Sequence, residues 1–337
     1  MTGRPETVAG QPDGQPDRAA GLLGRVADQP DRAPGRPDRA SDAAPPDPAH
    51  EFTTHRPLLF SIAYEILGSV ADAEDVLQDS YLRWRSVDRT SVENPRAYLA
   101  RIVTRQALGV LRSAARRREE YVGPWLPEPL ATDAVGEAPD GIDHVLTGEA
   151  VTTAMLLVLE ALSPAQRAVF VLREVFGFDY AEIAAAVGKS EAAVRQLNQR
   201  ARSSVRARRQ AAVATPAEAR PVAERFMAAA ATGDVQGLMD LLAPDVVFLG
   251  DGGGVVSAVR RPVTGPDKVA RLLLGLLAKG ARLGEVDIRT GVHNGMPSVM
   301  VLIDGVLDQV TSVEIRDGAV TAVYCVRNPQ KLTAVTV

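Results

Sequence analysis

The chain is 337 residues long, carries a formal net charge of −4, and is 46% hydrophobic and 24% charged. This length allows two or three domains with real cores, and the small negative charge means that any nucleic-acid-binding surface must be local. The single cysteine, Cys325, excludes an internal disulfide, and no apolar run approaches the ~20 residues that span a bilayer. Without a secretory signal, we expect a cytoplasmic protein that does not associate with membranes.

The first 50 residues repeat short Gln-Pro-Asp and Gly-Arg-Pro-Asp-Arg segments and end in Ala-Ala-Pro-Pro-Asp-Pro. Such a segment has few apolar groups to offset the entropy of ordering it. We therefore expect residues 1–50 to be a disordered tail, in which Leu22-Leu23 could contact a partner.

Helices are expected over residues 51–120. Phe52 to Leu67 is apolar enough for a buried helix, and Ser69 caps an amphipathic helix from Val70 to Trp84. The polar face of that second helix is acidic, which fits either a solvated surface or a docking surface for a basic partner. The next helix opens at Asn94-Pro95 and carries seven arginines and no acid from Arg96 to Arg118, a reasonable electrostatic footprint for phosphates.

Residues 121–143 are expected to be a linker. Trp125-Leu-Pro-Glu-Pro129 makes its first part stiff and extended, because proline disfavours helix for the residue before it. A tryptophan within a linker also suggests that the linker docks onto another part of the molecule.

Residues 144–210 are expected to form a second helical domain of about four helices. A helix is predicted from Thr147 to Leu162, and Ser163-Pro164-Ala165-Gln166 forms a capping box before a helix that ends at Phe176. Asp179 to Arg209 is typical of a helix-turn-helix.

The turn of that motif is predicted at Val187-Gly188-Lys189, with Ser190 capping the second helix. Seven Lys/Arg against one acid from Lys189 to Gln210 favour a helix that reads DNA over a solvated surface helix.

Residues 216–337 are expected to form a third domain, in which helices precede a mostly antiparallel sheet that encloses a pocket. Helices are predicted at 217–231, 235–242 and 265–277, and Asp251-Gly252-Gly253-Gly254 is a turn that requires glycine conformations. Strands are predicted at 244–249, 255–260, 284–293, 297–303, 306–316 and 319–326.

Catalysis in the third domain is an alternative interpretation. Asp251, His293 and Tyr324 are the available acid–base candidates, but Asp251 fits better as support for the tight turn, and His293 fits an exposed hairpin turn. Cys325 is expected to be a buried apolar residue. The histidines at 50, 55, 144 and 293 show no metal-ligand spacing, so no metal, cofactor or catalytic activity is predicted.

Motifs in the first two domains resemble the extracytoplasmic-function sigma factors of the sigma-70 family. They are Asp72-Ala-Glu-Asp75-Val-Leu-Gln78-Asp79-Ser-Tyr81-Leu-Arg83-Trp84, Pro95-Arg96-Ala97-Tyr98-Leu99, Leu162-Ser163-Pro164-Ala165-Gln166-Arg167 and the helix-turn-helix. The resemblance implies a protein that binds core RNA polymerase and directs promoter-specific transcription initiation. It further implies contacts with the clamp of the largest subunit and the flap of the second subunit.

By this resemblance, the acidic helix binds the polymerase clamp, the arginine-rich helix reads the minus-ten promoter element, and the helix-turn-helix reads the minus-thirty-five element. The implied polymerase-binding residues are Asp72, Asp75, Gln78, Asp79 and Arg83. The implied DNA-binding residues are Arg96, Arg101, Arg105, Arg112, Arg116, Lys189, Glu191, Arg195, Gln199, Arg202 and Arg206.

The last third resembles a SnoaL-like domain of the nuclear-transport-factor-two fold. The segments 125–129, 251–254 and 328–332 match the SigJ-like type of sigma factor, in which this fused domain is thought to regulate in cis. The regulatory contacts expected between linker and domain involve Trp125, Pro127, Glu128, Pro129, Asp251, Gly252, Gly253, Gly254, Asn328, Pro329, Lys331 and Leu332. The alternative is that the domain is a small-molecule sensor or a cyclase- or isomerase-like enzyme.

The fold expected from all these features is multidomain. Two all-α sigma domains, the second containing the helix-turn-helix, precede an α+β SnoaL-like cone with a curved antiparallel sheet. The chain departs from the usual residues of this group at Gly109, Val255 and Gln330, where Asp, a basic residue and Asp are common.

Overall fold

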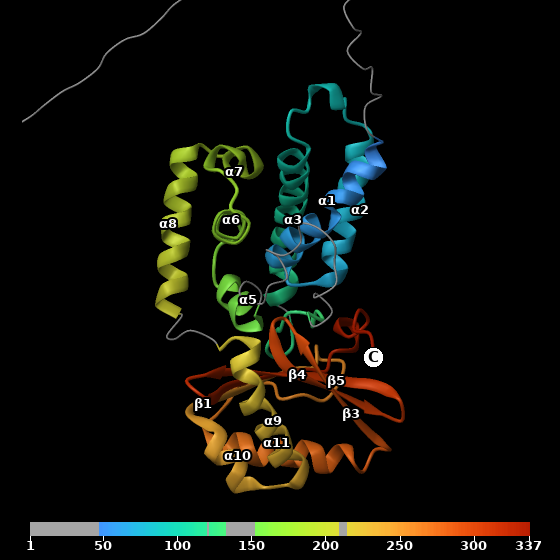
Figure 1. Ribbon diagram of the computed structural model, residues 1–337, viewed down its shortest axis with the longest axis vertical. Coiled ribbons are helices and arrows are strands. Elements are labelled where there is room, and N and C mark those ends of the chain that lie inside the picture. Colours follow the sequence, from blue (N-terminus) through green and yellow to red (C-terminus); the bar gives the residue numbers. More distant parts are fainter. Residues whose placement is uncertain (1–46, 120, 133–151, 209–213) are drawn as a thin grey trace, which may run out of the picture. The chain divides into compact units, whose positions relative to one another are not determined.

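Figure 1 is a computed structural model of the chain and describes residues 47–119, 121–132, 152–208 and 214–337. These residues all belong to one compact unit, Pro45–Val337. Residues 1–46 of the predicted tail, the linker after 132 and the start of the helix predicted from Thr147 lie outside the described residues. The expected tail includes residues 48–50, but these form the start of the first helix.

The first helices are α1 (Pro48–Leu67), α2 (Val70–Arg85) and α3 (Pro95–Glu119), with a 3₁₀ turn at Arg89–Ser91. Ser69 caps α2 by accepting a hydrogen bond from the Asp72 N–H at 3.1 Å. The amphipathic pattern of α2 turns Trp84 inward, where it is fully buried and its indole N–H donates to the Pro48 carbonyl at 3.1 Å.

The second set of helices is α5 (Thr153–Glu160), α6 (Pro164–Phe170), α7 (Tyr180–Val187) and α8 (Glu191–Arg208), with a π-helical turn at Val171–Val175. The capping box predicted at the start of α6 is present, since Ser163 and Gln166 exchange side-chain-to-backbone hydrogen bonds. A turn at Gly188 separates α7 from α8, so the helix-turn-helix forms as the sequence indicates.

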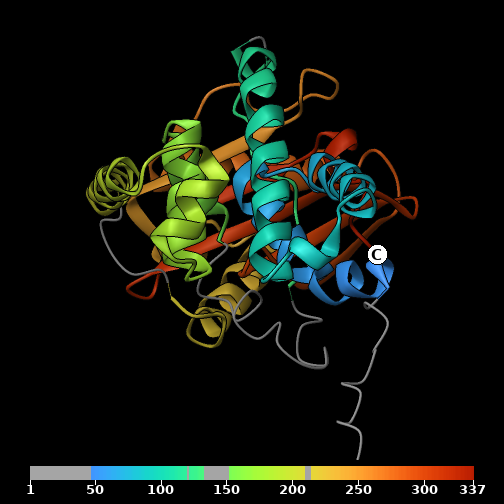
Figure 2. The same ribbon diagram turned by 90° about the horizontal axis from the view of Figure 1, so that it is seen from above.

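One apolar core runs through both sets of helices. It joins Leu59 of α1 and Leu99 of α3 to Leu156 of α5, Ile183 of α7 and Val194 of α8, each of which is fully buried. Figure 2 shows α3, in teal, running alongside the yellow-green helices of the second set. In the structure, the two helical segments are therefore packed against each other.

The C-terminal part consists of α9 (Pro216–Thr232), α10 (Val235–Leu241) and α11 (Pro266–Gly280) with one six-stranded sheet. The sheet order is β2-β1-β6-β5-β4-β3, and a 3₁₀ turn at Pro329–Lys331 follows the last strand. The strand bounds are β1 Leu242–Asp251, β2 Val263–Thr264, β3 Val286–His293, β4 Met296–Ile303, β5 Val306–Arg316 and β6 Ala319–Val326.

The sheet has apolar residues on both faces. One face packs against α9, α10 and α11 through residues such as Phe226, Phe248 and Val269 (Figure 1). The other face, through residues such as Met296, packs against Leu126 of the linker and Ala154 of α5. The linker and the second helical segment therefore rest on the sheet.

The predicted fold class is confirmed, with corrections of detail. The sheet is mixed rather than wholly antiparallel, because β1 pairs in parallel with β6, which the long crossover between them permits. No strand forms at 255–260, since the N–H groups of Val255 and Val256 both donate to the Gly252 carbonyl in a turn. His293 is 2% exposed rather than in an exposed turn, because Ala131 of the linker pairs with it.

The described residues include no helix with the length and apolarity needed to cross a membrane. Within the same residues, no cluster of His, Cys, Asp and Glu could hold a metal ion.

Candidate functional site

Asp251, the last residue of β1, is completely buried at the point where the linker meets the C-terminal domain. Its carboxylate accepts hydrogen bonds from the Leu126 N–H at 2.8 Å, the Tyr121 hydroxyl at 2.5 Å and the Gly253 N–H at 3.0 Å. Two of these donors, the Leu126 N–H and the Tyr121 hydroxyl, belong to the linker. A side chain of the sheet therefore binds both the backbone and a side chain of the linker that connects the helical segments.

Lys331 is the counter-charge to this carboxylate. Its ammonium group lies 2.8 Å from an Asp251 oxygen, donates to the Leu126 carbonyl and lies 4.0 Å from the centroid of the Trp125 ring. The residue is 6% exposed, and burial lowers the pKa of Lys331 while Asp251 opposes that shift. Burial, then the hydrogen bond with Asp251, raises the pKa of Tyr121.

Asn328 completes this cluster. Its side-chain amide donates to the Tyr121 hydroxyl at 2.9 Å, and its backbone N–H donates to the Asp251 carbonyl at 3.0 Å. Gly253 has a φ of 61° and lies so close to Asn328 that a Cβ would clash with the amide group. We call Tyr121, Trp125, Leu126, Asp251, Asn328 and Lys331 the linker clamp.

The next residues of the linker contact the first helical segment. The Glu128 carboxylate accepts from the Ser69 hydroxyl and the Val70 N–H, each at 2.7 Å, which places it at the positive N-terminus of α2. Its backbone N–H donates to the Gly68 carbonyl at 3.0 Å. Burial raises the pKa of Glu128, and these hydrogen bonds act in the opposite direction.

A third contact lies at the turn between β3 and β4. Asn294 accepts from the Leu130 N–H at 3.1 Å and donates to the Glu128 carbonyl at 3.2 Å. The Tyr64 hydroxyl of α1 lies 2.7 Å from the Glu128 carbonyl oxygen and 2.9 Å from the Asn294 amide oxygen. The linker is thus bound between the sheet and the first helices.

The structure therefore brings most of the proposed regulatory residues together. Pro127 and Pro129 are buried, Leu332 packs in the same cluster as Leu126, and Gly254 lies against Val122, whereas Pro329 is exposed. Gly252 is buried and approaches the Val256 carbonyl. The sequence patterns do not indicate Tyr121, Tyr64 or Asn294 as site residues. The only local signal is Asn294-Gly295, which follows His293 and is typical of an exposed hairpin turn.

Several arginines of α3 contact other groups of the protein, so they do not form a DNA-binding face that is free of partners. Arg105 donates to the carbonyls of Ala185 and Ala186 at the end of α7, at 2.7 and 3.2 Å. Arg96 lies 4.4 Å from the Phe178 ring centroid, and Arg101 stacks on Tyr98 of its own helix. Arg112 is exposed, and the side chain of Arg116 lies outside the described residues.

The outer face of α8 is exposed from Glu191 to Arg206 and carries Glu191, Arg195, Gln199, Arg202 and Arg206. Lys189 is exposed in the turn before the helix. Arg195 pairs with Glu191 at 2.9 Å and stacks over Tyr180, and Arg202 lies 3.7 Å from Glu174.

The acidic face of α2 is also exposed at Asp75, Gln78, Asp79 and Arg83, whereas Asp72 is half-buried at the start of the helix. The basic face of α8 and the acidic face of α2 therefore both remain open to a partner.

The candidates for catalysis do not meet. Asp251 belongs to the linker clamp, the His293 Nδ1 lies 2.6 Å from the Ser298 hydroxyl, and the Tyr324 hydroxyl donates to Glu314 at 2.7 Å. None of the three lines the large cavity of the C-terminal domain. Burial raises the pKa of the Cys325 thiol to about 11, in keeping with the buried, apolar role expected for it.

Comparison with known proteins agrees with this architecture. Residues 52–117 match the model of sigma-70 region 2, and residues 152–205 match that of sigma-70 region 4. The chain is 42% identical over 295 residues to the ECF RNA polymerase sigma factor SigJ of Mycobacterium tuberculosis, covering 84% of this chain and 92% of that protein. It is 31% identical to the probable ECF sigma factor SigI of the same species, over 82% of this chain and 92% of the relative.

The crystal structure of M. tuberculosis SigJ superposes with a TM-score of 0.66 and 36% sequence identity, covering 85% of this chain and 98% of that chain. The likeness therefore includes the C-terminal SnoaL-like domain as well as both helical regions. The chain belongs to the extracytoplasmic-function sigma factors of the sigma-70 family, which direct transcription by RNA polymerase.

Proposed function

We propose that the C-terminal domain regulates this sigma factor in cis by holding the linker between its two DNA-binding regions. The observation that supports this most directly is the bonding of both backbone groups of Leu126, the N–H by Asp251 and the carbonyl by Lys331. A linker fixed at this point limits how far region 2 and region 4 can separate.

Promoter recognition is assigned to the exposed basic faces. α8 reads the minus-thirty-five element through Gln199 and Arg206, with Arg195 and Arg202 released from their acidic neighbours on binding, and Lys189 adds a contact from the turn before the helix. α3 contributes Arg112 and Arg116 to the minus-ten element. Specificity for either element then rests on contacts with base edges, whereas phosphate contacts set affinity.

Polymerase binding is assigned to the acidic face of α2. Asp75 and Asp79 are exposed and suit a basic surface on the clamp of the largest subunit, while region 4 contacts the flap of the second subunit. The protein then works in the cytoplasm, where RNA polymerase acts.

The clamped arrangement is a state of low activity in this proposal. Arg96 and Arg105 of α3 are engaged by region 4, so they contact DNA only after α3 separates from α7. The linker clamp favours the packed state because it shortens the free length between the two regions. Release of the linker frees both DNA-binding faces together.

The test is transcription in vitro with core polymerase and Trp125→Ala in the full chain. Loss of the ring removes its contact with Lys331 and with Gly68, while both helical regions keep their cores. Raised promoter output with unchanged binding to core polymerase supports the proposal. Unchanged or lowered output from a variant that folds normally rejects it.

A further inference from the structure

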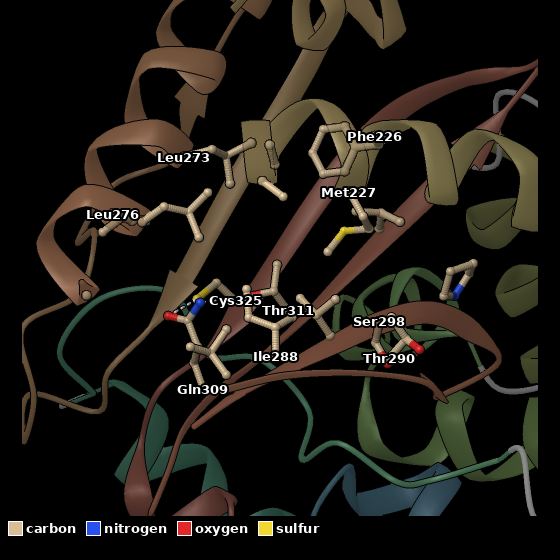
Figure 3. A pocket seen from close by; sticks show the side chains of 18 of the residues that line it. Phe226, Met227, Leu273, Leu276, Ile288, Thr290, Ser298, Gln309, Thr311 and Cys325 are labelled. Atoms are coloured by element: carbon tan, nitrogen blue, oxygen red, sulfur yellow. Dashed lines mark hydrogen bonds between the residues drawn. The ribbon is translucent and has the colours of Figure 1, made fainter. Parts of the chain in front are cut away.

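A cavity of about 1120 Å³ lies between the sheet and the helices α9 and α11. Figure 3 shows Phe226 and Met227 of α9 and Leu273 and Leu276 of α11 directed into it. Its volume is slightly above the usual range for small-molecule sites, which is about 300–1,000 Å³, so it has room for a drug-sized molecule. Side chains of α11 that line it are only half-buried, so the cavity leaves apolar surface unfilled.

The uncharged polar side chains of this cavity lie in two clusters. Gln309, Thr311 and Cys325 lie together on the sheet, where the Gln309 amide is 3.3 Å from the Thr311 hydroxyl and 3.5 Å from the Cys325 thiol (Figure 3). Thr290 and Ser298 form a second polar group further along the wall. These side chains can donate to or accept from a hydroxyl or carbonyl, but none offers a charge.

The charged side chains that line the cavity are paired with one another, except Lys279, which is exposed to solvent. Arg327 binds Asp308 through two nitrogens, at 2.7 and 3.1 Å, and Arg220 pairs with Glu224 on exposed α9. An ionic ligand would therefore lose hydration without gaining a buried partner. The chemistry favours a neutral molecule that is mostly apolar and carries hydroxyl or carbonyl groups.

Arg327 also connects the cavity to the linker clamp. It lines the cavity, its guanidinium donates to the Ser257 carbonyl at 2.7 Å, and its backbone N–H donates to the Asp251 carbonyl at 2.7 Å. The next residue is Asn328, which bonds Tyr121 of the linker. The wall of the cavity and the linker clamp are therefore adjacent in the chain, at Arg327 and Asn328.

We propose that the cavity of the C-terminal domain binds a neutral, largely apolar small molecule with hydroxyl or carbonyl groups, and that Arg327 transmits this binding to the linker clamp. This inference rests on the proposed function, for which it supplies the controlling input. The cavity is already formed in the clamped arrangement, so an occupant that fits it stabilises that arrangement by mass action. The ligand then acts as a repressor of promoter output.

The experiment uses the full chain and the neutral apolar fluorophore N-phenylnaphthylamine, which carries one N–H donor. Leu276→Trp fills the cavity from α11 and should abolish the rise in probe fluorescence. Val306→Trp adds the same ring at a site that is 71% exposed and outside the cavity, and should bind the probe as the unmodified chain does. Equal binding by both variants, or no binding by the unmodified chain, overturns the inference.

The second measurement is hydrogen exchange at the Leu126 amide with and without the probe. Bound probe should slow that exchange roughly fivefold or more, the lower end of usual coupling between sites. Arg327→Gln should bind the probe without slowing exchange, and Asp308→Asn provides a second variant of the same contact if the first does not fold. Probe binding that leaves Leu126 exchange unchanged in the unmodified chain overturns the coupling.

Sedimentation of the unmodified chain tests the remaining alternative, which is that a second copy of the chain covers the cavity. A dimer that dissociates when the probe binds would mean that a second copy covers the cavity, which overturns a small-molecule site. The transcription test of Trp125→Ala uses no probe. It therefore tests the proposed regulation by the linker independently of the ligand-binding inference.

Discussion

Lys331 and Asp251 form an ion pair of 2.8 Å whose side chains are 8% and 0% exposed, and both residues also bind the backbone of Leu126. A pair this deeply buried contributes less through its own attraction than through the cost of leaving one partner alone. The two charges therefore make attachment of the linker close to all-or-none.

Asp251→Ala should lower the free energy of unfolding of the full chain by about 3–5 kcal/mol, because it leaves the Lys331 ammonium and the Leu126 N–H buried without their acceptor. Urea denaturation measures the change. The matched control is Asp287→Ala, which removes an exposed partner of Arg289 and should cost less than about 1 kcal/mol. Equal losses in the two variants would contradict the account of the linker clamp.

Gly253→Ala should destabilise the chain more than Gly233→Ala does. Both glycines have positive φ, 61° and 73°, so each alanine carries a backbone cost of roughly 1–2 kcal/mol. Only at Gly253 does a Cβ meet another group, the Asn328 amide. The difference in the free energy of unfolding between the two variants measures the cost of the contact between the new Cβ and Asn328. If Gly253→Ala loses no more stability than Gly233→Ala, this contact has no cost.

Glu65 gives the packed helices a pH dependence. Burial raises the pKa of Glu65 to about 8, with Arg167 acting against the shift, and neither carboxylate oxygen has a hydrogen-bond partner. Between the ordinary carboxyl pKa, about 4.3, and the native value, the folded state holds a proton that the unfolded state has lost. The stability contributed by this group is therefore complete at low pH and declines as pH rises towards 8.

Glu65→Gln should remove that decline, so the variant should gain stability over the unmodified chain as pH rises from 5 to 8. Denaturation midpoints across this range measure the effect. Glu74→Gln serves as the control, because Glu74 is 45% exposed and pairs with Arg56. Parallel pH profiles for Glu65→Gln and the unmodified chain would show that Glu65 is ionised in the native state.

Arg105→Ala should loosen the packing of α3 on α7. The guanidinium bonds the last carbonyls of α7, where a cation also offsets the negative end of the helix, and such charged hydrogen bonds contribute about 1.5–3 kcal/mol. Hydrogen exchange of the α7 amides should accelerate accordingly. Arg112→Ala, at an exposed position of the same helix, should leave those rates unchanged; acceleration by both would indicate a general effect on α3.

Much of the fold could be predicted because its signals are local. Ser69 and Ser163 cap helices as their side chains indicate, and the bounds expected for the last four strands agree with the structure to within two residues. The segments that meet in the linker clamp could be predicted only through the family resemblance. Spacing along the chain contains no information about a contact between Tyr121 and Asn328, which are 207 residues apart.

Where the structure differs from the sequence-based expectations, the cause is tertiary contact, and tertiary contact also adds partners that the sequence does not indicate. Arg105 stays a predicted DNA-binding residue, but in this structure it bonds the last carbonyls of α7. His293 and Asn294 have the sequence of an exposed turn, yet Ala131 and Leu130 of the linker cover them. Val255 and Val256 have strand propensity, but the turn after Gly252 takes up their N–H groups.

The central claim is that the C-terminal domain controls transcription through the linker. The most direct measurement compares in vitro transcription, with core polymerase, by the full chain carrying Lys331→Met and by the full chain carrying Lys268→Met. Lys331→Met removes the buried ammonium from the linker clamp, whereas Lys268 is exposed on α11 and lies outside the cavity. Release of the linker should raise promoter output roughly fivefold or more for Lys331→Met, with Lys268→Met matching the unmodified chain. Equal output from both variants, with equal binding to core polymerase, would contradict the account.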